Sequence, residues 1–106
     1  MMPNVGLSDS ILRQIGDQAA LYPEIEALVL YGSRARGDYR PSSDIDLAVV
    51  AEHMPSRRFS EFWNALDDLP IIFKIDTLHM QRLSDQNLKK QILSQGIKLY
   101  QRKYPC

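Results

Sequence analysis

The stretch that decides the fold is LVLYGSRARGDYRPSSDIDLAVV, residues 28–50. Two apolar segments of strand length flank a loop that is dense in Arg, Gly, Asp, Pro and Ser. The first segment predicts a buried strand over 24–31 that ends at Gly32, and the second predicts a strand over 45–51. Residues 33–43 predict a short helical turn and a loop, which is too short a connection for a parallel crossover. We therefore expect the two strands to be antiparallel neighbours in a mixed sheet.

Helices are predicted on both sides of this stretch. Ser8 can cap a helix over 9–20, and apolar side chains at helical spacing predict a second helix over 57–68, which Pro70 closes. The apolar stripe of this second helix, which we expect to face the core, consists of Phe59, Phe62, Trp63, Leu66 and Leu69. Both helices are therefore expected to pack on the sheet.

The last third of the chain predicts one more strand and one more helix. Residues 71–77 predict a third strand, and Ser84 can cap a helix that ends at Gly96 in the left-handed conformation. Residues 97–100 predict either a short strand or a segment tucked under the sheet. No repeat or linker is visible, so we expect one domain over residues 1–106. The expected fold class is α/β (α+β), a small mixed sheet with helices packed on it.

The composition argues against several classes of protein. Thirteen basic and thirteen acidic side chains cancel, whereas proteins that bind long nucleic acids carry a basic excess, so no direct nucleic-acid binding is expected. No apolar run is long enough to span a membrane, and no secretory signal precedes the first helix. The one cysteine, Cys106, rules out an internal disulfide. These features are typical of a soluble cytoplasmic protein.

Two aspartates at the start of the second predicted strand form a candidate metal site. Side chains at i and i+2 of a strand, as for Asp44 and Asp46, point to the same face with Cα atoms roughly 6.5 Å apart. Two carboxylates so close repel each other unless a cation neutralises them, and Mg²⁺ is a hard ion that prefers oxygen ligands. If the third strand lies beside the second, Asp76 reaches the same face. Three carboxylates can hold two ions about 3.5–4 Å apart, which suits in-line phosphoryl displacement.

A candidate phosphate site lies where the first strand ends and the helical turn begins, at Gly32 and Ser33. Glycine allows a ligand to approach the backbone closely, and free N–H groups at the start of a helix attract phosphate oxygens. Arg34, Arg36 and Arg40 follow and can neutralise a polyphosphate. The turn would hold the β- and γ-phosphates, and the α-phosphate would lie between the turn and the metal ions.

Each of these features alone has an ordinary structural explanation. Asp44 can cap a turn in the loop before it, Asp76 can be a solvated strand end, and single arginines are usually surface residues. The joint spacing indicates a site, because ten residues separate the Gly-Ser pair from Asp44 and one residue separates Asp44 from Asp46.

This spacing, together with LYGSRARG (residues 30–37) and SSDIDL (residues 42–47), resembles the polymerase-beta-like nucleotidyltransferase superfamily. The resemblance is closest to its minimal nucleotidyltransferase (MNT) branch, whose members are commonly encoded beside a HEPN-domain protein. It implies an αβαβα core with a mixed sheet. It also implies that Gly32 and Ser33 bind a triphosphate and that Asp76, matched by strand position, accepts or orients the proton of the attacking hydroxyl.

Two sets of site residues follow from the motifs and the resemblance. The expected nucleotide-binding residues are Gly32, Ser33, Arg34, Arg36 and Ser43. The expected catalytic residues and ligands of Mg²⁺, with two ions expected, are Asp44, Asp46 and Asp76.

The resemblance also implies an activity and a partner. In the MNT branch the known activity is transfer of AMP from ATP to a HEPN toxin, usually at a tyrosine, which silences the ribonuclease of the toxin. We therefore expect an antitoxin with a HEPN partner, a nucleoside triphosphate substrate, a homo- or hetero-oligomeric state and no membrane association. The chain stops where larger family members add an acceptor-binding domain, which favours a protein partner that is itself the acceptor.

Two other functions stay open. One is a transferase that modifies a small hydroxylated molecule such as an aminoglycoside. The other is a non-catalytic module that blocks its partner sterically, which an intact set of three acids disfavours. The base of the nucleotide and the number of groups transferred are not determined by these motifs.

Histidines and tyrosines complete the set of candidate residues. His53 and His79 lie far from each other and from any cysteine, so no zinc site is expected, and His79 is expected at the surface. Tyr31 is expected to be packed, whereas Tyr39 can either stack on a base or be exposed.

Overall fold

The computed structural model describes residues 4–103 and contains a four-stranded sheet in the order β3-β2-β1-β4. The strands are β1 (Ala27–Tyr31), β2 (Ile45–Val50), β3 (Ile75–His79) and β4 (Ile97–Gln101). The helices are α1 (Asp9–Ala20), α2 (Ser33–Arg36), α3 (Ser56–Asp67), the 3₁₀ helix η1 (Met80–Arg82) and α4 (Gln86–Gln95). The expected fold class, a small mixed sheet with helices packed on it, is confirmed.

The strand directions follow from the lengths of the connections. The short segment through α2 joins β1 to β2, and these strands are antiparallel, as expected. The longer connection through α3 allows β3 to lie parallel to β2. The last segment of the chain, for which a strand was one of two expectations, forms β4 and pairs antiparallel with β1. Both β3 and β4 are edge strands.

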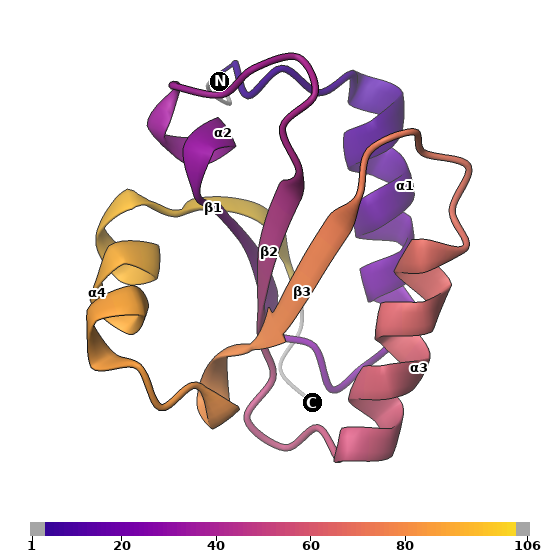
Figure 1. Cartoon of the computed structure of the whole chain (residues 1–106). Helices are drawn as coiled ribbons and strands as arrows, with labels where there is room; N and C mark the ends of the chain where they lie inside the picture. Colours follow the sequence, from indigo (N-terminus) through magenta and orange to yellow (C-terminus); the bar gives the residue numbers. More distant parts are fainter. Residues whose placement is uncertain (1–3, 104–106) are drawn as a thin grey trace.

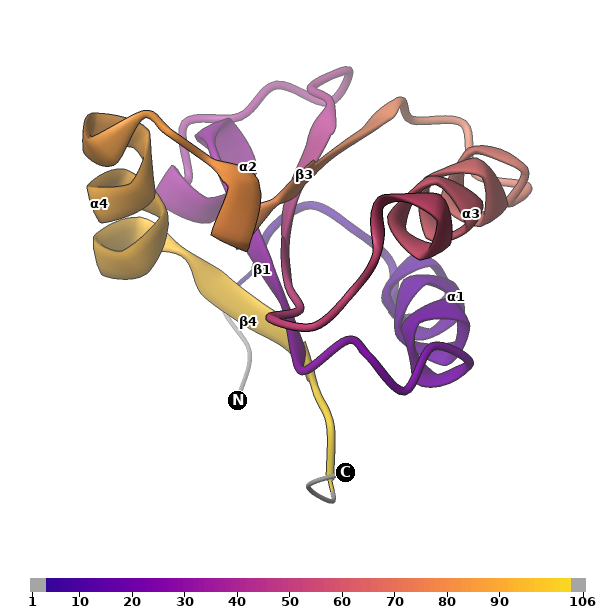
Figure 2. The same cartoon turned by 90° about the horizontal axis from the view of Figure 1, so that it is seen from below.

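The sheet separates two apolar clusters, and Figures 1 and 2 show α1 and α3 on one face with α4 on the other. The larger cluster, between the sheet and α1 and α3, includes Ile15, Leu28, Leu47 and Phe62. The smaller cluster, between the sheet and η1 and α4, is centred on Ala48, Met80 and Ile92. Because side chains alternate along a strand, Leu47 and Ala48 belong to different clusters. Both faces of the central strands are therefore covered.

The helix ends agree with the sequence at α1 and differ from it at α4. The Ser8 hydroxyl accepts from the Ile11 N–H at 3.2 Å and begins α1 as expected. At α4, Asp85 and not Ser84 is the cap, because the Asp85 carboxylate accepts from the Leu88 N–H at 3.1 Å. Aspartate and serine are about equally good N-terminal caps, so residue type alone does not show which of Ser84 and Asp85 caps the helix.

The expectation for Gly96 was wrong. Gly96 is extended, with φ −69° and ψ 150°, and is not left-handed. A side chain at this position would collide with the Val29 side chain and the Ile92 carbonyl. Glycine is therefore required here for the close approach of α4 to β1 and not for its freedom at positive φ.

The third strand begins later than its apolar residues predict. Residues 71–74 form a loop, and the strand covers Ile75–His79, so Asp76 lies near its start. Ile72, which the prediction placed inside the strand, is 92% exposed. Parallel pairing with β2 explains the shift, because it sets Ile75 beside Ile45 and Asp76 beside Asp46.

Two further expectations about burial were wrong. Trp63 of the apolar stripe is 44% exposed, whereas Phe62 and Leu66 are fully buried as expected. His79 is buried, with its ring stacked on Phe59 and its Nε2 atom 2.6 Å from the Ala51 carbonyl oxygen. His79 ends β3 beside Val49 of β2, so its ring lies within reach of the carbonyl of Ala51, which directly follows β2.

None of the helices within residues 4–103 combines the length and the apolar character that a membrane span requires. Cys106 lies outside the described residues.

We predict that Glu24→Gln destabilises the fold in a pH-dependent way. The Arg58 Nε and Nη2 atoms donate to the two carboxylate oxygens of Glu24 at 2.6 and 3.1 Å, which joins α3 to the segment before β1. This pairing lowers the pKa of Glu24. The variant should lose on the order of 1 kcal/mol of unfolding free energy at pH 7.

Denaturant titrations at several pH values test this prediction. A carboxyl whose pKa is lowered by folding contributes stability above its unfolded pKa of about 4.3, and the contribution disappears as the pH falls through the folded pKa. The stability difference between wild type and Glu24→Gln should therefore vanish in acid. Glu52→Gln, at an exposed glutamate near the same end of the sheet, is the control. An equal loss in both variants would contradict the role of the ion pair.

Candidate active site

The expected site residues gather at one end of the sheet. Figure 1 shows α2, the loop before β2 and the loop before β3 at this same end. The strand register sets Tyr31 of β1 opposite Asp46 of β2, and Asp46 beside Asp76 of β3. Residues in register on neighbouring strands point to the same face, so these side chains form a row across three strands. This row lies on the face of the sheet that carries α4.

Asp46 lies directly against the turn at Gly32. Gly32 has a φ of +77° and a ψ of −155°, a conformation that is essentially restricted to glycine. A side chain at this position would collide with the Asp46 carboxylate, mainly at Oδ2. The two halves of the expected site, the glycine turn and the aspartates, are therefore in contact through a space that only glycine leaves open.

The three aspartates influence one another electrostatically. Burial, and then the negative charges of Asp76 and Asp44, raise the pKa of Asp46 above its ordinary value. The positive charges of Arg36 and Lys74 oppose this shift. Asp76 forms an exposed ion pair with Lys74, with Oδ1 and Nζ 3.6 Å apart. The site thus holds three negative charges close together, an arrangement that is uncommon among ordinary surface residues.

The fit of these residues to Mg²⁺ depends on donor chemistry. Within residues 4–103, no three His, Cys, Asp or Glu side chains lie close enough together to surround one metal ion. The Asp46 carboxylate lies over Gly32, and that of Asp76 lies beside Lys74. Their donors are all carboxylate oxygens, on facing residues of adjacent strands with Asp44 close by, and this is the ligand type that Mg²⁺ prefers. The donor set therefore fits the ion, although these positions do not form a coordination shell.

Tyr31 was expected only to pack, but its environment is that of the acids. Burial, and then the charges of Asp46 and Asp76, raise the pKa of Tyr31 to about 12. The phenol therefore keeps its proton at neutral pH and can donate a hydrogen bond from within the acidic row. The signal in the sequence is the antiparallel register, which sets the last residue of β1 opposite the second residue of β2.

The turn expected to bind phosphate begins the short helix α2. Gly32 is its N-terminal cap, and no side chain caps the helix at this end. The Gly32 and Ser33 carbonyls accept from the N–H groups of Arg36 and Gly37 at 3.1 and 2.9 Å, which closes the turn. Arg36 is exposed, and its Nε atom lies 3.3 Å from Oδ2 of Asp38. Its positive charge also acts on Asp46 and opposes the rise of the pKa there. Of the two arginines that were expected to bind nucleotide, Arg36 is the one that faces solvent near the acids.

The structure uses Arg34 differently from the expectation. Arg34 is 1% exposed, and its guanidinium makes five hydrogen bonds to four backbone carbonyls. The carbonyls belong to Val5, Gly6, Pro41 and Ser43, at donor–acceptor distances of 2.9 to 3.4 Å. These bonds occupy its donors, so Arg34 is a structural residue of the site and not an available phosphate ligand. Spacing alone could not separate it from Arg36.

Two neighbours of Arg34 have structural roles as well. The Ser43 hydroxyl accepts from the Arg40 N–H at 2.8 Å, and its carbonyl accepts from Arg34, so Ser43 shapes the loop that leads into Asp44. For Tyr39 the sequence left open whether it stacks on a base or is exposed. The Arg34 guanidinium lies over the Tyr39 ring, with its carbon atom 5.1 Å from the ring centroid. Arg40 is exposed.

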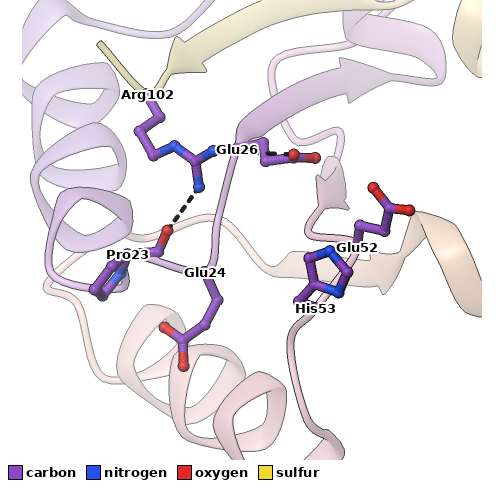
Figure 3. A pocket seen from close by; sticks show the side chains of 6 residues that line it. All are labelled: Pro23, Glu24, Glu26, Glu52, His53 and Arg102. Atoms are coloured by element: carbon purple, nitrogen blue, oxygen red, sulfur yellow. Dashed lines mark hydrogen bonds and ion pairs between the residues drawn. The ribbon is translucent and has the colours of Figure 1, made fainter. Parts of the chain in front are cut away.

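A different hollow, of about 390 Å³, lies at the opposite end of the strands (Figure 3). Its lining residues are Pro23, Glu24, Glu26, Glu52, His53 and Arg102. Glu24 pairs with Arg58, and Arg102 lies 4.0 Å from Glu26 and donates to the Pro23 carbonyl at 2.9 Å. Much of its charge is therefore already compensated within the fold, and none of the expected site residues lies here.

Comparison with known proteins identifies the family. The family model described as "Polymerase beta, Nucleotidyltransferase" matches residues 13–104, which is most of the chain and includes every expected site residue. The chain belongs to this nucleotidyltransferase family. A search of the curated proteins found no match.

Solved structures with the same fold include toxin–antitoxin complexes. A chain of the toxin–antitoxin MntA-HepT matches this nucleotidyltransferase with a TM-score of 0.67 and 20% identity, over 91% of this chain and 74% of that one. A chain of a toxin–antitoxin with AMP-PNP gives 0.63 and 24%, over 92% and 76%. A chain of the complex between a tri-AMPylated Shewanella oneidensis HEPN toxin and an MNT antitoxin gives 0.59 and 22%, over 90% and 70%. At these identities the likeness supports the fold.

We predict that Arg34→Met is strongly destabilising in this nucleotidyltransferase. The variant keeps a long side chain but leaves four carbonyls without their donor, so the unfolding free energy should fall by about 3 kcal/mol. Arg34→Lys should recover only part of this loss, because an ammonium cannot reproduce the planar fork of the guanidinium. Urea unfolding followed by circular dichroism measures both. Arg40→Met, at an exposed arginine, is the control, and an equally small effect in both methionine variants would refute the structural role.

We predict that Gly32→Ala disturbs the acids of the nucleotidyltransferase, whereas Gly37→Ala does not. Both glycines have positive φ, +77° and +90°, so both variants should lose roughly 1–3 kcal/mol through backbone strain. Only at Gly32 does the added methyl group meet Asp46, since nothing lies within 4 Å of it at Gly37. Backbone amide shifts of residues 45–47 should therefore move in Gly32→Ala alone. Equal shifts in both variants would contradict the contact.

Proposed function

We propose that this nucleotidyltransferase transfers AMP from ATP to a tyrosine hydroxyl of a partner HEPN ribonuclease toxin and so acts as its antitoxin. The observation that carries the proposal is the register of Asp46 beside Asp76, with the Asp46 carboxylate against the Gly32 turn. This arrangement brings a candidate phosphate turn into contact with the carboxylate of Asp46, whose neighbour in register is Asp76. The fold shared with MNT antitoxins in complex with HEPN toxins supports the choice of partner.

The turn at Gly32 and Ser33 would hold the β- and γ-phosphates. Its glycine lets phosphate oxygens approach the backbone N–H groups, and the Ser33 hydroxyl can donate one further hydrogen bond. The exposed Arg36 guanidinium can neutralise part of the charge of the triphosphate. Arg34 and Ser43 would act indirectly, because they fix the loop between this turn and Asp44.

The residues that would hold Mg²⁺ are Asp44, Asp46 and Asp76. The ion would supply positive charge to the phosphates and to the repelling carboxylates when bound. The chain itself sets Asp46 and Asp76 on two neighbouring strands, with Asp44 in the loop before β2, and keeps Tyr31 protonated beside them. The Tyr31 hydroxyl is thus available to orient a carboxylate or a phosphate oxygen.

The proposed reaction is an in-line displacement at the α-phosphorus. The acceptor oxygen forms a bond to this phosphorus, and the bond from the phosphorus to the oxygen that bridges to the β-phosphate breaks. Pyrophosphate leaves with that electron pair, and AMP stays on the acceptor as a phosphodiester. The acceptor proton passes to the Asp76 carboxylate, which lies on an edge strand with its charge exposed, and from there to water.

An assay of AMP transfer tests the proposal. The protein is mixed with ATP labelled at the α-phosphate, Mg²⁺ and a HEPN-domain protein from the adjacent reading frame, where one is encoded there, and label on the partner is measured. Asp44→Ala and Asp46→Ala should lower the rate at least about a hundredfold, because each removes a carboxylate that would hold Mg²⁺ beside the reacting phosphate. Asp76→Ala should still bind nucleotide but transfer little.

The control is Asp17→Ala, which removes an exposed aspartate from α1, away from the site. It should transfer AMP at the wild-type rate. If Asp44→Ala and Asp46→Ala still neutralise the toxin fully, the enzymatic account of antitoxin action is wrong. Unchanged turnover in Asp76→Ala would remove that residue from the site.

A further inference from the structure

A second hollow at the active end of the sheet is not used by the nucleotide in the proposal above. It measures about 440 Å³ and is lined by Pro41, Ser42, Asp44, Ile72, Phe73 and Lys74. These residues come from the loop before β2 and the loop before β3. The loops meet where the Ile45 N–H donates to the Lys74 carbonyl at 2.9 Å. The hollow therefore adjoins Asp44 directly, and Asp76 through its ion pair with Lys74.

The lining of the hollow is largely apolar and is open to solvent. Ile72 is 92% exposed, which is the largest value among the large apolar side chains that the structure describes. Asp44 and Lys74 contribute one negative and one positive charge, so the lining has no net charge. An aminoglycoside carries several positive charges and would find one carboxylate here. A segment of polypeptide with apolar side chains fits this lining better.

Both walls of the hollow are held by the same buried group. The Arg34 guanidinium donates to the Pro41 and Ser43 carbonyls at 3.4 and 2.9 Å, which fixes the wall before β2. Its carbon atom lies 4.6 Å from the centroid of the Phe73 ring, which fixes the wall before β3. The hollow is therefore formed before any ligand binds, and binding does not have to order its walls.

The position of the hollow matches the direction of attack in an in-line displacement. In such a reaction the attacking oxygen approaches from the side opposite the leaving group. The leaving pyrophosphate would lie at the Gly32 turn, which follows β1, whereas the hollow opens at the β2–β3 side of the acids. We propose that this hollow binds the apolar polypeptide segment that carries the acceptor hydroxyl and that Ile72 determines acceptor specificity. The inference rests on the function proposed above.

The test compares two short peptides as acceptors. One carries a tyrosine between two leucines, and the other carries a tyrosine between two serines. With α-labelled ATP and Mg²⁺, the wild-type chain should label the leucine peptide with a kcat/KM about tenfold higher than the serine peptide, since an apolar contact at Ile72 favours it. Ile72→Asp should reduce this preference to within about twofold. Leu93→Asp, at a residue of α4 that is 74% exposed, should keep it.

The outcomes separate this inference from the proposed function. A preference that persists in Ile72→Asp, or kanamycin labelled better than either peptide, would overturn the assignment of the hollow. If the wild-type chain labels neither the peptides nor the HEPN protein, the proposed function is wrong. In that case the leucine peptide is added to the ¹⁵N-labelled chain. Amide shifts at residues 42–44 and 72–74 that disappear in Ile72→Asp support the hollow as a polypeptide site, and shifts confined to other residues refute it.

Discussion

The buried guanidinium of Arg34 holds together the segments that build the end of the molecule where Asp44, Asp46 and Asp76 lie. Its donors bind carbonyls of the N-terminal segment and of the loop before β2, and its faces lie against Tyr39 and Phe73. A charge taken out of water must be compensated by such contacts, which makes their geometry strict. The loop that carries Asp44 thus has a defined position without belonging to a helix or strand. A short loop can be ordered in this way by one side chain beneath it.

The acids show the opposite arrangement, in which like charges are kept close. Asp46 and Asp76 are neighbours across a parallel strand pair, and the pKa of Asp46 is raised by burial and by the two nearby carboxylates. Such repulsion weakens the fold locally, and folds retain it where a ligand of opposite charge relieves it. Arg34 and the acid row therefore have complementary roles. Arg34 fixes the position of the loop before β2, and the acid row keeps negative charge to which a cation can bind.

The sequence predicted the fold where the pattern is local. Antiparallel pairing followed from the short connection between β1 and β2, and the family followed from the spacing of the glycine turn and the aspartates. The expectation that β3 lies beside β2 was confirmed, although the strand begins four residues later than predicted, at Ile75. The roles of Asp44, Asp46 and Asp76 as metal ligands stay predictions. Features that depend on partners distant in the sequence were not predictable. The carbonyls that enclose Arg34 come partly from Val5 and Gly6. His79 is buried because the Ala51 carbonyl accepts a hydrogen bond from its ring.

The parallel pairing of β2 with β3 has a consequence for the order in which the site is assembled. The Gly32 turn and Asp46 are joined by a short hairpin-like connection, so their contact is local and closes at a small cost in chain entropy. Asp76 comes beside Asp46 through the pairing of β3 with β2, and the longer crossover through α3 separates these strands in the sequence. Contacts of longer separation form more slowly in folding. A growing or partly folded chain can therefore have the Gly32 turn in place while it lacks Asp76, and the complete acidic row requires the pairing of β2 with β3 as well.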